Sequence, residues 1–284
     1  MPIGMPAAWV AAVLLAQAAP STPSASSSRW SASVTFERAR ESLRYRFENP
    51  SSFDAVGLVP HFFEQTYDTA NGWLGLRLRH PGPARGAEAR VAMTPQATRR
   101  ADDFDTFFLP GGNVVVSGTT GNASIRSWRI EERVSLGYVR GIEFGAALGY
   151  RYDSARYHEG IGIVTMTAPP PETRRLVTTR EFVSSRMLEG AVFMSARRRA
   201  FAVTADVVPA AAARLQVDLP DKYPGRLLVF GARYSSAGAE VRYARRIGPA
   251  RAGMGVRAHA TWPWRHAAEV HRRSFGVFLE MGTD

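Results

Sequence analysis

Alternating apolar and polar residues over residues 124–157 are the clearest structural signal in the chain. In the first arm, residues 124–138, even positions are mostly apolar and odd positions are polar or charged. The second arm, residues 142–153, repeats the pattern with small or charged residues at odd positions. Because successive side chains of a strand point to opposite faces, the pattern predicts a hairpin with one apolar face and a tight turn at residues 139–141.

The polar face of this hairpin carries a dense set of charges: Arg129, Glu131, Arg133, Glu143, Arg151 and Asp153. A soluble sandwich would bury the apolar face, whereas a transmembrane barrel turns it toward lipid and encloses the polar face. Each arm has about twelve residues or more, and a tilted strand needs roughly 9–11 to cross a bilayer. We therefore expect the six charged side chains to form an ionic network in the lumen of a membrane barrel. A large soluble β-protein with a wet outer face is the alternative.

Strands and turns recur at short spacing from residue 30 to the end of the chain, without a helical period. The pattern predicts an all-β fold in which residues 29–284 form a single closed antiparallel transmembrane β-barrel. We expect about 10–14 strands, with about twelve as the best estimate. If the turn at 139–141 faces the periplasm, long loops at residues 95–121 and 158–174 lie outside the cell. Side chains would plug the lumen of a barrel of about ten to twelve strands.

The first residues predict export. Residues 1–18 combine an apolar core with the Ala16-Gln17-Ala18 pattern of a cleavage site, although no basic residue precedes the core. Residues 19–28 are rich in proline and serine and predict a flexible tether. The expected location is therefore the outer membrane, reached after removal of a signal peptide.

Composition narrows the possible partners. The 284 residues carry a net charge of +11 and no cysteine, which excludes disulfides, thiolate chemistry and a lipoprotein anchor. Only Lys222 is a lysine among 36 basic residues, and the arginines are spread over many strands without a nucleic-acid-binding motif. We expect outer-membrane lipid as the partner, with some exposed arginines meeting lipopolysaccharide phosphates. No nucleic acid, cofactor or metal is expected, and a monomer is favoured.

Asp103 and Asp105 are the strongest candidates for chemistry. They stand two positions apart in the acidic segment 101–105, so on an extended chain their side chains point the same way. Such a pair could polarise a water molecule as a general base, or hold a hard cation such as calcium. A solvated acidic loop is the simpler alternative.

The pair Asp103 and Asp105 resembles the Asp-x-Asp pair of the omptin outer-membrane proteases. Residues 41–50 and 149–157 are similar to an early and a middle strand of that family. The resemblance implies a ten-stranded barrel and a catalytic role for the two aspartates. Omptins also need an Asp-x-His pair, and this chain has none. Its histidines are His61, His80, His158, His259, His266 and His271, and none has an aspartate two positions before it. His158 is the one candidate substitute.

The sequence therefore favours an outer-membrane β-barrel of structural, binding or small-pore type, with no demonstrable enzyme activity. The first alternative is an omptin-like surface endopeptidase that uses Asp103 and Asp105. The second is a secreted soluble β-protein.

Overall fold

The computed structural model describes residues 30–48, 59–80, 86–95, 97–108, 114–166, 173–177, 180–220, 225, 227–264 and 268–283. The predicted signal peptide (1–18) and tether (19–28) lie outside these residues. The strands are β1 (Ser31–Glu48), β2 (Val59–His80), β3 (Ala87–Met93), β4 (Ala97–Phe108), β5 (Val114–Val139), β6 (Ile142–Met166), β7 (Thr173–Val177), β8 (Glu181–Arg198), β9 (Phe201–Asp218), β10 (Leu227–Ile247), β11 (Ala250–Pro263) and β12 (Ala268–Thr283). A search of the described residues finds no helix that is long and apolar enough to span a membrane.

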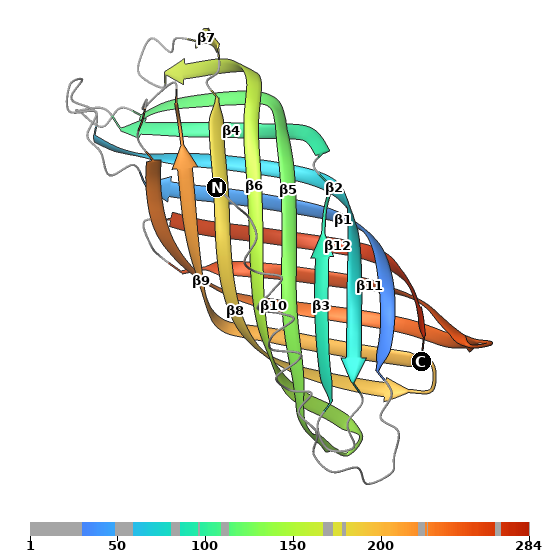
Figure 1. Cartoon of the computed structure of the whole chain (residues 1–284). Helices are drawn as coiled ribbons and strands as arrows, with labels where there is room; N and C mark the ends of the chain where they lie inside the picture. Colours follow the sequence, from blue (N-terminus) through green and yellow to red (C-terminus); the bar gives the residue numbers. More distant parts are fainter. Residues whose placement is uncertain are drawn as a thin grey trace.

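All these strands belong to one antiparallel sheet, which closes on itself as a barrel (Figure 1). Both β3 and β4 pair with β2 on one side and β5 on the other, so they are two pieces of one barrel strand. The short strand β7 pairs with β6 beside the start of β8. The predicted all-β closed barrel is therefore confirmed, with ten barrel strands and one extra strand. The estimate of twelve was too high, because Pro95, which has no N–H to donate, lies where one barrel strand divides.

The predicted central hairpin is β5 and β6. Arg140 and Gly141 join the strands with φ angles of 49° and 82°. Positive φ at both positions is typical of the type I′ turn, which matches the right-handed twist of paired strands. The β8–β9 and β10–β11 connections are also short and lie at the same end of the barrel. We call this the turn end, and the opposite end the loop end.

The prediction of long loops at residues 95–121 and 158–174 was wrong. Most of the first segment forms β4 and the beginning of β5, whose register runs from Ala97↔Ile125 to Phe108↔Val114. Much of the second segment extends β6, which pairs with β5 as far as Met166. Strands β5 and β6 therefore have 26 and 25 residues. Since about 9–11 tilted residues cross a bilayer, both strands continue well beyond one.

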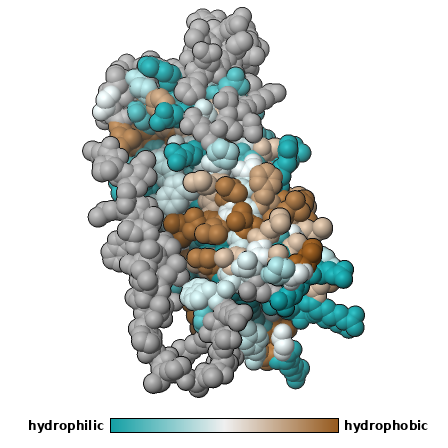
Figure 2. All heavy atoms as spheres, turned by 45° about the vertical axis from the view of Figure 1, so that its right-hand side comes forward, coloured by the Kyte–Doolittle hydropathy of each residue, from teal (hydrophilic) through white to brown (hydrophobic). Residues whose placement is uncertain are grey.

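Large apolar side chains form an exposed belt around the outside of the barrel, nearer the turn end. Its members include Val34, Phe36, Leu74, Leu76, Val91, Met93, Leu148, Leu188, Val192, Met194, Val203, Val207, Val241, Met254, Val256, Phe275, Val277 and Leu279. Figure 2 shows apolar residues gathered across the middle of one face, with hydrophilic residues on either side. At the same level, buried positions include Glu37, Arg133, Glu240, Arg242 and Glu280. This part, which we call the belt half, is apolar outside and charged inside.

Nearer the loop end the arrangement is reversed. On β1, Leu43, Tyr45 and Phe47 are buried, whereas the alternating Arg44 and Arg46 are more exposed. The buried residues of this region form one apolar cluster contributed by strands around the barrel. This loop half is therefore built like a soluble protein, with an apolar core and charged outer positions.

Candidate functional site

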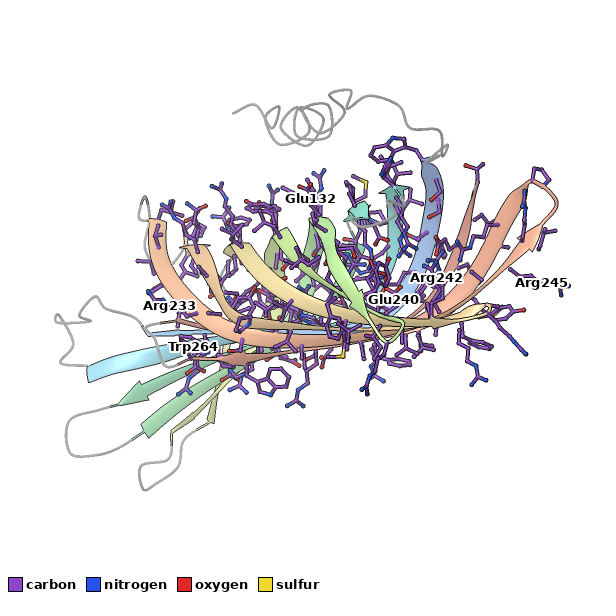
Figure 3. The ribbon with its side chains drawn as sticks, turned by 90° about the horizontal axis from the view of Figure 1, so that it is seen from below. Glu132, Arg233, Glu240, Arg242, Arg245 and Trp264 are labelled. Carbon is purple, nitrogen blue, oxygen red and sulfur yellow. The ribbon has the colours of Figure 1, made fainter. Side chains whose placement is uncertain are left out.

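Ion pairs cross the interior of the belt half. Nη1 of Arg90 on β3 lies 3.3 Å from Oε2 of Glu240 on β10, five strands away in the ten-stranded ring. Arg257 on β11 donates to the same carboxylate at 2.6 Å and to Glu37 on β1 at 3.3 Å. Figure 3 shows Glu240 and Arg242 among the strands, whereas Arg245 projects at one end of the barrel. These contacts fix the spacing between opposite walls.

The structure places all six residues of the predicted network beside an oppositely charged group. Glu131 bonds to Arg133, and Asp153 accepts a hydrogen bond from Arg151 at 2.9 Å. The other two have partners that the sequence reading did not single out. Arg129 donates to Glu37 at 2.8 Å, and Glu143 lies 3.9 Å from Arg79. The six residues are spread along the interior and do not form one compact cluster.

Trp73 on β2 lies between two of these arginines. The guanidinium carbons of Arg129 and Arg151 are 4.6 and 4.9 Å from the centre of its indole ring. The side chain is almost fully buried. Cation–π attraction is strongest for Trp and increases when the cation is desolvated. Trp73 therefore stabilises two buried charges that come from β5 and β6.

Glu41 on β1 lies at the boundary between the two halves. Its carboxylate accepts a hydrogen bond from Asn71 at 3.0 Å and lies 3.7 Å from Arg151 and 3.8 Å from Arg272. Arg272 is also 3.7 Å from Asp153. Two buried carboxylates and two buried guanidiniums thus share one site. Such a group tolerates burial only because each charge has partners.

A cavity of about 110 Å³ lies inside the belt half. Its wall includes arginines from several strands, the carboxylates of Glu131, Glu189 and Asp206, and His259 on β11. The small residues Ala147 and Gly149 leave this space open on the β6 side. A polar cavity of this size has room for several water molecules.

The loop-half cluster closes the interior above this cavity. We call this cluster the seal; its larger members include Tyr45, Phe47, Tyr67, Tyr157, Met187, Leu215, Phe230 and Tyr234. The hydroxyls of Tyr45 and Ser185 are 2.8 Å apart, and the hydroxyl of Tyr234 donates to Glu189 at 2.6 Å. Gln65 accepts from Tyr67 at 2.7 Å and donates to Glu181. The polar edges of the aromatic rings are thus satisfied across the barrel.

The predicted catalytic pair lies toward the loop end. Asp103 and Asp105 belong to β4, where they pair in register with Gln65 and Phe63 of β2. The side chains of both aspartates, and that of His158, lie outside the described part of the structure. Their proposed chemistry therefore stays a prediction. The described residues contain no group of three or more acidic or histidine side chains arranged to hold a metal ion.

A Glu-x-His pair lies on the outer face of β12 near the loop end. Nε2 of His271 is 3.1 Å from Oε2 of Glu269. The sequence analysis missed this pair because it searched for Asp-x-His. In the sheet, β12 is separated from β4 by β2 and β1, which at about 4.8 Å per strand gives about 14 Å. The pair is too distant for a direct hydrogen bond to the Asp103 and Asp105 backbone.

Exposed arginines follow the belt on its loop-end side. We call Arg126, Arg156, Arg186, Arg214 and Arg233 the arginine girdle; they come from β5, β6, β8, β9 and β10. Arg186 and Arg214 are direct cross-strand partners, although like charges in that position repel each other. Trp264 lies beside the girdle, where its backbone N–H donates to the carbonyl of Arg233 at 2.8 Å (Figure 3). The girdle is a cationic band at the edge of the apolar surface.

The barrel is similar to known outer-membrane proteins in structure but not detectably in sequence. No protein-family model matches the chain, and no curated protein matches it in sequence. The outer-membrane protease OmpT from Escherichia coli has a TM-score of 0.63 at 11% identity, covering 92% of this chain and 98% of that chain.

The translocator domain of the autotransporter NalP from Neisseria meningitidis has a TM-score of 0.36 at 10% identity, covering 98% and 94% of the two chains. The toluene transporter TodX from Pseudomonas putida has a TM-score of 0.29 at 8% identity, with 91% and 90% covered. The likeness to OmpT supports the partial structural resemblance to omptins. Together with the closed barrel and its belt, it supports an outer-membrane location.

Proposed function

We propose that the protein is a closed outer-membrane barrel of structural or binding type and not an open pore. The observation that carries this proposal is the seal, which fills the loop half above the ion-paired belt half. Short turns of outer-membrane barrels face the periplasm, so the turn end faces inward and the loop half projects from the cell. Export through a cleaved signal at residues 1–18 belongs to the same proposal.

Conductance tests the closed interior. Barrels inserted into a planar lipid bilayer should show no steady current steps. A variant that removes part of the seal, Tyr45→Ala with Met187→Ala, should give measurable steps if it folds, which its heat-modifiable gel mobility would show. Steady conductance of the wild-type protein would overturn the proposal.

The girdle supports lipid phosphates as the partner of the outer surface. A guanidinium binds phosphate oxygens with two parallel hydrogen bonds, and anions between Arg186 and Arg214 would relieve their repulsion. The position of the girdle, on the loop-end side of the belt, is the level of outer-leaflet headgroups in the proposed orientation.

Lipopolysaccharide binding tests this partner. The double variant Arg186→Ser, Arg214→Ser should retain less lipopolysaccharide after detergent extraction than the wild type. The matched control is Arg198→Ser with Arg199→Ser, which removes two arginines at the turn end. Equal retention by the wild type and the girdle variant would exclude the girdle as the binding site.

An omptin-like endopeptidase is the second candidate. Two observations favour it: the likeness of the fold to OmpT, and the position of Asp103 and Asp105 toward the loop end of β4. Purified barrel in lipopolysaccharide would be incubated with a mixed peptide library. Cleavage that disappears in both Asp103→Asn and Asp105→Asn would support this candidate, and absence of cleavage by the wild type would reject it.

A further inference from the structure

Three arginines from well-separated strands meet at the turn-end opening of the barrel. They are Arg79 on β2, Arg197 on β8 and Arg251 on β11, and each is three or four strands from the other two in the ring. Arg79 lines one cavity with Arg197 and a second with Arg251. Arg197 is close enough to Arg79 and Arg251 for their charges to act on it. The three guanidinium groups therefore converge from different sides of the opening.

The opening carries more positive than negative charge. The two cavities are lined by seven arginines, Arg77, Arg79, Arg90, Arg133, Arg197, Arg242 and Arg251, and by four glutamates, Glu88, Glu143, Glu240 and Glu280.

Three of these glutamates are already bound to arginines other than the converging three. Glu88 accepts from Arg77 at 2.6 Å, and Glu280 accepts from Arg242 at 2.6 Å. Glu240 is held by Arg90 and Arg257 (Figure 3). Glu143 is 3.9 Å from Arg79, beyond hydrogen-bond distance. An anion at the opening would balance the excess charge.

The space behind the opening leads inward and is closed at its far end. Arg90, Arg133 and Glu240 line both a turn-end cavity and the 110 Å³ cavity of the belt half. Beyond the belt half lies the seal. The two turn-end cavities, of about 40 and 20 Å³, have room for one or a few water molecules each. A ligand therefore enters from the turn end and remains near it.

We propose that this opening binds a small phosphate-bearing anion through Arg79, Arg197 and Arg251. Each guanidinium offers a planar fork of donors that fits two oxygens of a phosphate. Three forks from three directions suit a tetrahedral group with several charged oxygens better than a single planar carboxylate. The site is separate from the arginine girdle, which lies on the outer surface beyond the other edge of the belt.

Pyrophosphate is the test ligand. Isothermal titration would use the full barrel in a nonionic, phosphate-free detergent at low salt, where screening is weakest. The wild type should bind pyrophosphate, and Arg197→Ser and Arg79→Ser should each weaken binding at least tenfold. No binding by the wild type at millimolar pyrophosphate would overturn the proposal.

Arg198→Ser is the matched control. Arg198 is the next residue on β8 and alternates to the outer face, so it does not line the cavity. Its substitution should leave pyrophosphate binding within twofold, and loss equal to that in Arg197→Ser would show unspecific charge attraction and overturn the site. Heat-modifiable mobility would verify folding of every variant. Tighter binding of a short-chain phosphatidic acid than of pyrophosphate would assign a lipid headgroup as the source of the phosphate, and weaker binding a free anion.

Discussion

Tyr45 on β1 and Ser185 on β8 are joined across the barrel by hydroxyl oxygens 2.8 Å apart. The two strands are five positions apart in a ring of ten, so they form opposite walls. Both side chains are buried in the loop half. A direct bond between opposite walls leaves no open passage at this level, which links the packing of the seal to the proposed absence of conductance.

Tyr45→Phe should destabilise the barrel moderately. The substitution keeps the ring in the seal but leaves the buried Ser185 hydroxyl without its partner, which costs roughly 1–3 kcal/mol of unfolding free energy. Urea unfolding in lipid vesicles, followed by tryptophan fluorescence, measures the change. Tyr138→Phe, at an exposed position near the turn end, is the control and should have little effect. Equal stability of Tyr45→Phe and the wild type would show that the cross-barrel bond contributes nothing.

Trp73→Ala should be among the most destabilising single substitutions. It leaves a cavity, which costs roughly 3–5 kcal/mol, and removes the aromatic surface shared by Arg129 and Arg151. The same unfolding measurement applies. The control Trp262→Ala removes an indole that is 54% exposed on the outer surface, and its effect should be smaller. A loss in Trp73→Ala no larger than in the control would contradict the interior role of the ring.

The sequence predicts the belt half better than the loop half. On β1, the apolar residues from Trp30 to Phe36 occupy even positions, whereas Leu43, Tyr45 and Phe47 occupy odd positions. Alternation therefore continues along the strand while its apolar face changes from outside to inside. A single rule that turns every apolar face toward lipid is correct in the belt half and wrong nearer the loop end. Residues 114–122, rich in Ser, Thr and Gly, lack the alternation and were therefore taken for a loop.

The candidate site was only partly accessible from sequence. Alternation on the central hairpin identifies which charges share a face, because that property is local. The partners Glu37, Arg79 and Trp73 come from strands far away in sequence, and their positions depend on register and closure. Charge convergence at the turn-end opening likewise requires the closed ring. No local pattern in one sequence carries that information.

Glu240→Gln tests the cross-barrel ion pairs. Removing the carboxylate charge leaves Arg90 and Arg257 with fewer counter-charges in a buried site, and breaking a buried pair costs roughly 3–5 kcal/mol. Arg90 keeps Glu88 and Arg257 keeps Glu37, so the loss should fall near the lower limit. The control Glu64→Gln breaks the more exposed Arg44–Glu64 pair, which should cost roughly 0–1 kcal/mol. Equal losses would mean that the interior behaves like bulk solvent.

Leu279 and Leu227 provide a direct test of where the membrane lies. Both are 56% exposed, but Leu279 lies within the belt on β12, whereas Leu227 begins β10 at the loop end. Arginine facing lipid near the midplane costs roughly 2–4 kcal/mol, and the cost falls to roughly 0–1 near the interface. Leu279→Arg should therefore destabilise the barrel in lipid vesicles by at least 2 kcal/mol, and Leu227→Arg should change it little. In detergent micelles, which adapt their shape around a charge, the difference should shrink. Equal effects in vesicles would mean that the bilayer also covers the loop half, and would contradict its projection into water.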